Sequence, residues 1–513
     1  MRRGSDPLIG MYLSAVFCSL LAGLILCSLR VAATQQPRHP PSRIAVVGAG
    51  IGGTSAAYFL RQKFGKDVQI DIFEKGDVGG RLATIEMEEN QYEAGGSVIH
   101  PLNLHMKSFV KDLGLSTCTL SANLLGIYNG EEFVFQESEW FLINFIKKLW
   151  NYGLNFLRKY MWAEDLLDKF MRIYRYQTFD YSFSTTESLL HAMAGDDFVS
   201  KLNMSIGEEM QKYGFTQRFI DEMVVPVMRF NYGQGVEMNA FVGAISYAWT
   251  ESGVWAVAGG NKLVCSGLLN AAKAQFIQGT VTSVQEKVHS TKSGNTVKMY
   301  EISYVTDTGP GLDLYDIVVI ATPLNKKLSN IEFVGFDPPI ETLPKPYQQM
   351  VTTFVHGRIN ASFFGCSAPC QFPLLDILTT KNPKFFIHSI SAASPVNPVP
   401  ESDASKAVGL RVWKIFSPEV LTDEQLHQLF ESYYAVKVRS WLAYPRYSPP
   451  EKIPSIKLHR AIYYLNGIEW AASAMEMSAI SAKNVALLSY HQWYGKDDHI
   501  DQQDLAERLK SEL

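Results

Sequence analysis

The sequence predicts an α/β fold built on a parallel β-sheet, and three features near the start of the mature chain lead to this prediction. The run Ile44–Val47 is apolar and mostly β-branched, which is typical of a buried parallel strand. A helical pattern follows, and Val68–Phe73 is a second apolar strand that ends at Glu74. Between the first strand and the helix lie three glycines in the order G-x-G-x-x-G, namely Gly48, Gly50 and Gly53. This succession indicates a unit that binds a nucleotide.

Each of these residue types suits one part of a bound nucleotide. Gly48 permits a tight turn, Gly50 lets the backbone approach a pyrophosphate, and Gly53 lets the helix pack closely on the strand. The helix N-terminus supplies free N–H groups and a positive dipole for phosphate. Glu74 lies about twenty residues beyond the last glycine, where a carboxylate can bind ribose hydroxyls. A glycine-rich turn without a ligand is the alternative, and the complete pattern makes it the weaker one.

The residues after Glu74 favour FAD over NAD as the nucleotide. Gly79 and Gly80 allow a second close approach of the backbone, and Arg81 can bind a phosphate or the flavin edge. The run Glu93–Ser97 is a further passage of small residues, where an NAD domain would usually continue into its next strand. No second G-x-G-x-x-G occurs downstream, which favours electrons that come from a substrate rather than from a nicotinamide.

Charge and composition exclude some classes of function. The 513 residues carry a formal net charge of −4, and the sequence has no long basic or acidic run. This balance argues against nucleic acid as the main partner. No catalytic triad and no metal-ligand cluster stands out, so the prediction includes no metal ion.

The N-terminus predicts entry into the secretory pathway. Two arginines precede an apolar run that ends in small residues near Ala33, so 1–33 is predicted to be a signal peptide and 34–42 a linker with several prolines. An uncleaved signal anchor is the alternative, because the apolar run is long enough to span a bilayer. Asn203 and Asn360 each begin a glycosylation sequon, which fits this route.

Four cysteines remain in the predicted mature chain: Cys118, Cys265, Cys366 and Cys370. Four are too few for a disulfide scaffold in so long a chain. Cys366 and Cys370 are the closest pair in sequence for a single bridge, and free buried thiols are the equally strong alternative.

The run from Ile44 to Arg81 resembles the flavin-containing amine oxidase superfamily. Later segments that fit the same scheme are Gly259–Leu263, the strand around Val281, Val318–Pro323 and Tyr463–Ala486. The resemblance implies that Val281 meets the adenine through its backbone and that the last segment, including Gly467 and Glu469, binds the flavin. We expect a strand at Tyr463–Leu465 and a helix that opens at Gly467, with small residues that let the flavin ring lie near the backbone. A packing helix without a ligand is the alternative.

Within this superfamily the chain is most similar to the prenylcysteine oxidase family, over about 43–513. The strings that carry this resemblance are Tyr92–Pro101, Asp168–Tyr176, Gly260–Gly267 and Ala472–Met477. The resemblance implies a flavoenzyme that oxidises farnesyl- or geranylgeranyl-cysteine with O2 and water. The products would be a prenyl aldehyde, free cysteine and hydrogen peroxide. It also implies a role in the degradation of prenylated proteins and a lysosomal location.

Two residues are candidates for catalysis. His100 follows the second glycine passage and is predicted to lie near the flavin, although a structural histidine is the stronger alternative. Many members of the superfamily carry a lysine on the strand after a Pro-Pro turn, and here that strand, Val351–His356, has none. Lys414 is predicted to replace it in handling oxygen. An allylic carbon bonded to sulfur needs a dry apolar slot and exact positioning more than a strong base.

The resemblance divides the chain into interleaved parts. We expect an FAD-binding Rossmann-like domain of the glutathione reductase and amine oxidase type, with an interleaved α+β substrate domain. The FAD-binding domain is assigned to 43–122, 239–335 and 455–492. The substrate domain is assigned to 123–238, which is mainly helical, and to 336–454, which is mainly a sheet. The remaining 493–513 is a C-terminal tail.

The region 140–176 is rich in aromatic and aliphatic residues and predicts two helices that separate near Gly153. Their apolar faces suit an isoprenoid tunnel or contact with a membrane surface. An ordinary helical core is the alternative. Rival functions for the whole chain are an amine oxidase, an isoprenoid desaturase, and a lipid-binding paralogue that lacks catalysis.

Overall fold

The computed structural model describes residues 39–120, 123–248, 253–290, 296–340, 345–366, 373–382, 384–397 and 410–509. The chain divides into two compact units, Met1–Pro40 and Pro41–Leu513, and every element below belongs to the second. The predicted signal peptide 1–33 and most of the linker 34–42 lie outside the described residues. Within the described ranges, no helix combines the length and the apolar character needed to cross a membrane.

The nucleotide-binding pattern folds into a six-stranded sheet. Its order is β20-β21-β13-β1-β2-β9, and the neighbours from β21 to β9 run parallel. β20 pairs antiparallel at one edge. The strands are β1 (Arg43–Val47), β2 (Gln69–Glu74), β9 (Gln275–Gln278), β13 (Ile317–Ile320), β20 (Lys457–His459) and β21 (Ile462–Tyr464). Ile44, Ala45 and Val46 are fully buried, as expected for a strand covered on both faces.

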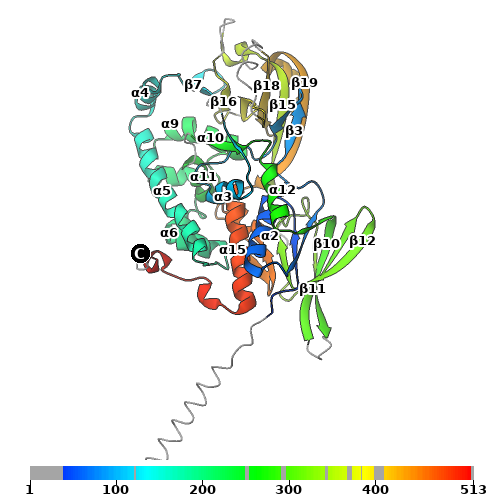
Figure 1. Cartoon of the computed structure of the whole chain (residues 1–513). Helices are drawn as coiled ribbons and strands as arrows, with labels where there is room; N and C mark the ends of the chain where they lie inside the picture. Colours follow the sequence, from blue (N-terminus) through cyan, green and yellow to red (C-terminus); the bar gives the residue numbers. More distant parts are fainter. Residues whose placement is uncertain are drawn as a thin grey trace, which may run out of the picture. The chain divides into compact units, whose positions relative to one another are not determined.

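Two helices from opposite ends of this unit lie side by side against the sheet. They are α2 (Ile51–Phe64), which starts right after the glycine turn, and α15 (Met475–Tyr494) (Figure 1). Ala56 and Ala57 of α2 are fully buried, and small residues of this kind allow close helix packing. The first and last parts of the unit therefore share one core.

Two larger sheets and two short strand pairs make up the rest of the β structure in the described residues. A four-stranded sheet has the order β12-β11-β10-β14, and a seven-stranded sheet has the order β19-β15-β18-β17-β16-β6-β7. The strands of the first are β10 (Thr280–Ser290), β11 (Thr296–Thr306), β12 (Gly309–Tyr315) and β14 (Glu332–Val334). Those of the second are β6 (Leu125–Tyr128), β7 (Phe133–Gln136), β15 (Tyr347–Ile359), β16 (Asp376–Thr379), β17 (Ser389–Ala392), β18 (Arg411–Ser417) and β19 (Phe430–Pro445). Two short pairs are β3 (Thr84–Met87) with β4 (Asn90–Glu93), and β5 (Thr117–Thr119) with β8 (Trp255–Val257).

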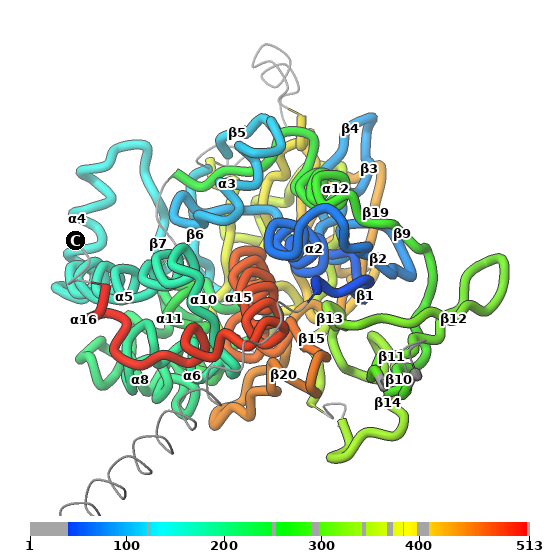
Figure 2. The backbone as a smooth tube through the Cα atoms, turned by 60° about the horizontal axis from the view of Figure 1, so that its bottom comes forward, coloured from blue at the N-terminus to red at the C-terminus, as the bar shows by residue number. Residues whose placement is uncertain are grey.

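A layer of helices lies on the other side of α2 and α15 from β10, β11 and β12 (Figure 2). It contains α4 (Phe141–Tyr152) and α5 (Asn155–Thr178), which separate at Gly153 with φ of +57° as predicted. The other helices between residues 186 and 248 are α6 (Thr186–Ala194), α7 (Asp196–Ser200), α8 (Ile206–Lys212), α9 (Gln217–Phe219), the π-helical turn Ile220–Val224, α10 (Val225–Tyr232) and α11 (Ala240–Ala248). Other α-helices in the described residues are α3 (Leu104–Asp112), α12 (Lys262–Ala271), α14 (Asp423–Leu429) and α16 (Leu505–Arg508).

The structure differs from the expected division in two places. β6 and β7 lie inside the part assigned to helices, yet they extend the seven-stranded sheet by pairing with β16. α11 lies inside the second part assigned to FAD binding, yet it packs against α5 and α8. Phe241 and Val242 on α11 are fully buried, so this helix needs an apolar partner on all sides, which the helical layer supplies.

The helix expected to open at Gly467 starts later. β21 ends at Tyr464, a 3₁₀ helix covers Leu465–Trp470, and α15 begins only at Met475. The hydroxyl of Tyr447 causes this delay, because it donates to the Glu469 carbonyl at 2.9 Å and accepts from the Ser473 N–H at 3.0 Å. These backbone groups are thus satisfied without helical hydrogen bonds.

Candidate active site

The turn after β1 has no room for side chains at two of its glycines. Gly48 has φ of +108°, and a β-carbon there would lie 2.7 Å from the carbonyl oxygen of Ala321. A β-carbon on Gly53 would lie 1.9 Å from the carbonyl oxygen of Gly48. Gly50 differs, because its β-carbon would meet only the Gly79 oxygen at 3.6 Å. The fold therefore requires Gly48 and Gly53, whereas Gly50 leaves space for a ligand.

An elongated cradle lies beside this turn. A cavity of about 420 Å³ is lined by five predicted cofactor residues: Gly48, Gly50, Glu74, Gly80 and Arg81. A neighbouring cavity of about 270 Å³ shares Gly48 and Glu74 and adds Val281, the residue predicted at the adenine. Ser440–Tyr444 on β19, which sequence reasoning did not assign, also lines the cradle. Asn466 and Ser473–Met475 line it as well, and they belong to the segment that was predicted to bind the flavin. A long ligand with a nucleotide at one end fits this outline.

Glu74 ends β2 at the junction of the two cavities. One carboxylate oxygen accepts a hydrogen bond from the Ala49 N–H at 2.8 Å, and the other accepts from the Gly76 N–H at 2.9 Å. These bonds join the glycine turn to the following loop. Each carboxylate oxygen retains a further acceptor site, so the predicted contact to ribose hydroxyls is compatible with them.

Two polar atoms in residues that line the cradle have no partner. Trp441 Nε1, a donor, and Asn466 Oδ1, an acceptor, are buried without a hydrogen bond among the described residues. Buried polar atoms are normally paired, so each such atom needs an explanation. The edge of a flavin ring carries both acceptors and donors, and thus the residues present fit this group.

Arg81 and Glu469 form an ion pair at the border of the cradle. The Arg81 guanidinium also donates to the Ala443 carbonyl at 2.7 Å. Glu469 is buried and accepts further hydrogen bonds from Asn466 at 2.7 Å and from the Tyr347 hydroxyl at 3.2 Å. Glu469 and Gly467 were predicted to bind the cofactor, yet neither lines the cavity. Glu469 instead holds Arg81 and Asn466, which do line it.

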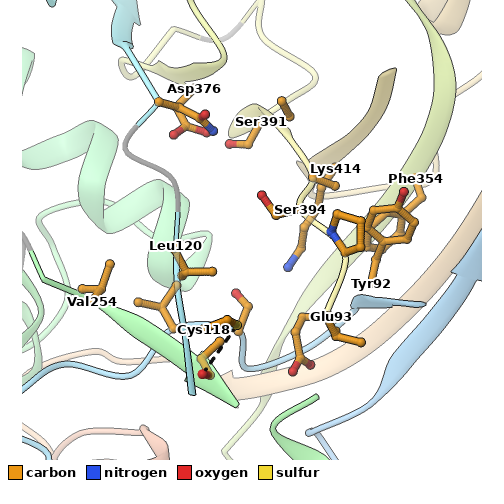
Figure 3. Close-up of a pocket in the computed structure, with 18 of the residues that line it drawn as sticks. Tyr92, Glu93, Cys118, Leu120, Val254, Phe354, Asp376, Ser391, Ser394 and Lys414 are labelled. Atoms are coloured by element: carbon orange, nitrogen blue, oxygen red, sulfur yellow. Dashed lines mark hydrogen bonds between the residues drawn. The ribbon is translucent and has the colours of Figure 1, made fainter. Parts of the chain in front are cut away.

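A second pocket of about 250 Å³ adjoins the cradle (Figure 3). Consecutive residues belong to the two spaces, because Gly96 lines the cradle and Ser97 lines the pocket. Most of the exposed lining is apolar. The apolar residues include Tyr92, Val98, Leu120, Phe230, Val254, Phe354 and Phe416, and the polar ones include Glu93, Cys118, Asp376, Ser391 and Lys414. Eight separate segments of the chain thus meet at this pocket.

Burial shifts the titration of the charged groups here. Burial raises the pKa of Glu93 to about 7, although the Asn261 N–H donates to it at 2.5 Å and Lys414 and Lys262 oppose the shift. Burial lowers the pKa of Lys414 to about 8, against the attraction of Glu93. The pKa of Asp376 is also raised by burial. These groups respond to small changes of charge in the pocket, as is common in functional sites.

Of the two predicted catalytic residues, Lys414 lies in the pocket and His100 does not line any of these cavities. Lys414 is on β18 opposite Phe354 of β15, the strand that the superfamily comparison expected to carry a lysine. His100 is buried, and its Nδ1 accepts a hydrogen bond from the Leu102 N–H at 3.2 Å. This placement favours the structural alternative, because the imidazole stabilises the turn before α3. The catalytic role of His100 stays a prediction.

Other predicted sites lie away from these cavities. Asn203 is exposed, and Asn360 is partly buried with its side-chain amide donating to the Gln428 carbonyl at 3.0 Å. Cys265 is buried, and burial raises its pKa to about 12, so it is an inert thiol. The bridge considered for Cys366 involves Cys370, which lies outside the described residues. Within the described ranges, no three His, Cys, Asp or Glu side chains gather as a metal site would require.

Comparison with known proteins now identifies the family. The model for prenylcysteine lyase matches residues 135–502, and that for an NAD(P)-binding Rossmann-like domain matches residues 46–113. Prenylcysteine oxidase 1 from Homo sapiens is 58% identical over 495 residues, which cover 96% of this chain and 97% of that protein. The chain belongs to the prenylcysteine oxidase family. Prenylcysteine oxidase 1-like from Homo sapiens is 46% identical over 95% of this chain and 98% of its own length.

Solved structures confirm the fold predicted for this family member. Putrescine oxidase bound to putrescine has a TM-score of 0.55 at 14% identity and covers 87% of this chain and 98% of its own. A CLA-producing fatty acid isomerase from P. acnes has a TM-score of 0.57 at 15% identity. The match covers 86% of this chain and 97% of the isomerase chain. The predicted α/β fold with a Rossmann-like domain is therefore confirmed.

Proposed function

We propose that the chain is an FAD-dependent oxidase that cleaves prenylcysteine. The observation that carries this proposal is the junction at Gly96 and Ser97, where a dinucleotide-shaped cradle opens beside an apolar pocket. The higher identity to prenylcysteine oxidase 1 than to its 1-like relative, 58% against 46%, supports the catalytic reading over the paralogue.

The cradle residues suit FAD in particular. Gly50 and the N-terminus of α2 suit the pyrophosphate, Glu74 suits the ribose, and the backbone at Val281 suits the adenine. At the other end, Trp441 and Asn466 suit the flavin ring. When bound, FAD supplies a hydride acceptor that O2 can reoxidise.

The pocket's own contribution is to hold the substrate and to exclude water. Phe230, Val254, Phe354 and Phe416 offer an apolar wall for an isoprenoid chain beside the cradle. In the reaction, the carbon between sulfur and the double bond loses a hydride and becomes a cation shared by both. Water adds to that carbon and releases a proton, and the carbon–sulfur bond then breaks to give an aldehyde and the cysteine thiol. The hydride electrons and two protons reduce O2 to hydrogen peroxide, so one prenylcysteine consumes one O2 and one water.

Lys414 was predicted to handle oxygen, and this role stays a prediction. Its place in the pocket beside Glu93 is compatible with that role. It is equally compatible with a role in substrate binding.

A location in the secretory pathway, and in the lysosome in particular, is part of the proposal. Support comes from the apolar N-terminal run, from the exposed sequon residue Asn203 and from the family itself.

We also propose that α4 and the start of α5 contact a membrane surface. Phe141 is 81% exposed and Trp150 is 87% exposed, and both lie among other exposed apolar residues: Trp140, Leu142, Ile146, Leu154 and Met161. α4 contains Lys147 and Lys148 and no carboxylate. An apolar, aromatic and basic helix surface of this kind suits the interface of an anionic bilayer.

An oxidase assay tests the main proposal. Full-length protein with its flavin is mixed with S-farnesyl-cysteine in air, and the flavin band, peroxide, aldehyde and thiol are followed. We expect bleaching of the band and the three products in equal amounts. S-dodecyl-cysteine, which is apolar but not allylic, is the control and should not react. Absence of all three products with S-farnesyl-cysteine would contradict the proposal.

A further inference from the structure

The pocket beside the cradle contains a lysine and a carboxylate that attract each other but form no ion-pair contact with each other. Among the described residues, Lys414 forms no ion pair, and its Nζ lies 4.9 Å from the centre of the Phe416 ring. Glu93 uses one carboxylate oxygen to accept from the Asn261 N–H, and its Oε2 is buried without a partner. Figure 3 shows the amine of Lys414 pointing into the pocket, on the side where Glu93 lies.

Two incompletely paired polar groups in an empty apolar pocket lower the stability of the folded protein. A buried charge is stable when it is paired and hydrogen-bonded, and an unpaired polar atom away from water costs free energy. Both groups are largely shielded by apolar neighbours, which include Tyr92 and Phe354. A ligand that carries a positive and a negative group close together would satisfy both at once.

We infer that Glu93 and Lys414 bind the amino-acid head of the substrate, with Lys414 pairing its α-carboxylate and Glu93 accepting from its α-ammonium. This inference rests on the proposed function, because it gives a role to the cysteine part of prenylcysteine. The two charged groups of an amino acid share one carbon, so a single small head can reach both side chains.

The other polar groups of the pocket are less suited to this task. Asp376 is already hydrogen-bonded by the side chains of Ser391 and Asn123. The Cys118 sulfur lies 3.6 Å from the Ala256 carbonyl oxygen, to which it donates. Glu93 thus offers the free acceptor, and the phenylalanine rings remain for the isoprenoid chain.

The same arrangement defines the substrate class. A zwitterionic head between Glu93 and Lys414 selects free prenylcysteine over a prenylated peptide, in which the α-amine is an amide. It also disfavours a simple alkylamine, because an amine leaves Lys414 without an anion. Such a site therefore accepts the last product of proteolysis rather than an intact protein.

The test compares binding and turnover for ligands that differ by one charge. The ligands are S-farnesyl-cysteine and S-farnesyl-cysteamine, which lacks the carboxylate. The proteins are the flavin-loaded wild type, Lys414→Met, and Lys437→Met as matched control. Lys437 faces the same residue Phe354 from β19, but its amine donates to the Glu86 carbonyl outside the pocket. Kd is read from the concentration dependence of the change in the flavin spectrum after rapid mixing under nitrogen, and KM and kcat are read from peroxide release.

We expect Lys414→Met to weaken the binding of S-farnesyl-cysteine, so that its Kd and KM rise about 10- to 100-fold with little change in kcat. Binding of S-farnesyl-cysteamine should be weak in the wild type and unchanged by this substitution, and Lys437→Met should behave as the wild type does. N-acetylation of S-farnesyl-cysteine should weaken binding to the wild type and have little further effect in Glu93→Gln.

Several results would overturn the inference. A fall in kcat with unchanged Kd in Lys414→Met would assign the lysine to oxygen instead. An equal loss of affinity for both ligands in Lys414→Met would mean that the lysine has a structural role. Failure of the wild type to bind S-farnesyl-cysteine would contradict the head-group site. If the wild type binds this ligand with the expected charge preference but releases no peroxide, the inference stands and the proposed oxidase function fails.

Discussion

Arg81 and Glu469 are paired through two contacts although 388 residues separate them in the sequence. One guanidinium nitrogen lies 3.3 Å from Glu469 Oε2, and a second contacts Oε1. This fork-to-fork geometry fixes both side chains, so the segment after the glycine turn and the segment before α15 share one anchor at the border of the cradle.

Replacement of Glu469 by glutamine should therefore destabilise the protein and empty the cradle. Loss of the carboxylate leaves the guanidinium of Arg81, whose side chain is 36% exposed, without its ion-pair partner, at a cost of about 1–3 kcal/mol. The measurements are the melting temperature and the ratio of flavin to protein absorbance after purification. Tyr347→Phe, which removes only the hydroxyl bonded to Glu469, is the milder control. A Glu469→Gln variant with wild-type flavin content would argue against this anchor.

Substitutions at two glycines of the glycine turn should have different effects, one on folding and the other on cofactor binding. Gly53→Ala is expected to unfold or to fail in expression, because its β-carbon would lie 1.9 Å from the Gly48 oxygen. Gly50→Ala is expected to fold, since its β-carbon meets only one atom at 3.6 Å, and to lose flavin because that carbon enters the cradle. Circular dichroism and flavin content distinguish the two. A soluble Gly50→Ala protein that retains full flavin would refute the assignment of this space to the pyrophosphate.

Glu476 should make stability depend on pH. It is fully buried at the start of α15 and accepts from the His105 and Met106 N–H groups and the Tyr174 hydroxyl. Burial raises its pKa to about 7 from an ordinary 4.5. The folded state thus holds a proton that the unfolded state has lost, and the associated stability is complete below pH 4.5 and is lost as the pH rises through 7.

Glu476→Gln lacks this dependence, so its melting temperature should improve relative to the wild type as the pH rises from 5 to 8. Scanning fluorimetry at each pH unit measures the difference in melting temperature between the variant and the wild type. Buried histidines have the opposite pH dependence, but they are present in both proteins, so their effect cancels in this difference. Glu164→Gln, on an exposed part of α5, is the control. A constant difference across the range for Glu476→Gln would mean that this carboxyl is ionised throughout.

The exposed surface of α4 should control binding to vesicles. The double variant Phe141→Ser and Trp150→Ser should bind vesicles of phosphatidylcholine and phosphatidylserine more than about tenfold more weakly, because two large apolar contacts are lost. Co-sedimentation measures the bound fraction, and turnover of a soluble short-chain substrate should not change. Tyr434→Ser, which changes a 72% exposed ring on β19, is the matched control. Equal binding by the double variant and the control would exclude α4 as the contact.

The parts of this structure that could be predicted from the sequence are those whose conformation depends on residues close by in the sequence. The strand Ile44–Val47, the glycine turn and Glu74 lie within about thirty residues, and each has a local physical requirement. The break at Gly153 was predictable for the same reason. The late start of α15 was not, because the cause is the hydroxyl of Tyr447, which lies outside that segment.

The candidate site shows the same limit. Lys414 was predicted only as a substitute for the lysine that Val351–His356 lacks, and the structure places it in the pocket. Its neighbour Glu93 was noted only as part of a small-residue passage. Asp376 was missed because an acidic residue at the end of a strand usually has only a structural or solvent-exposed role. The role of Glu469 could not be read from its own motif, since its partner Arg81 lies at the other end of the chain.

The cradle also sets the order of events in biosynthesis. Its walls come from residues as early as Gly48 and as late as Ser478. While the chain leaves the ribosome, the glycine turn and α2 emerge early, and α15, which packs along α2, emerges late. Coenzyme capture must therefore follow synthesis of α15, and a premature stop codon ahead of Met475 would yield a protein without bound coenzyme.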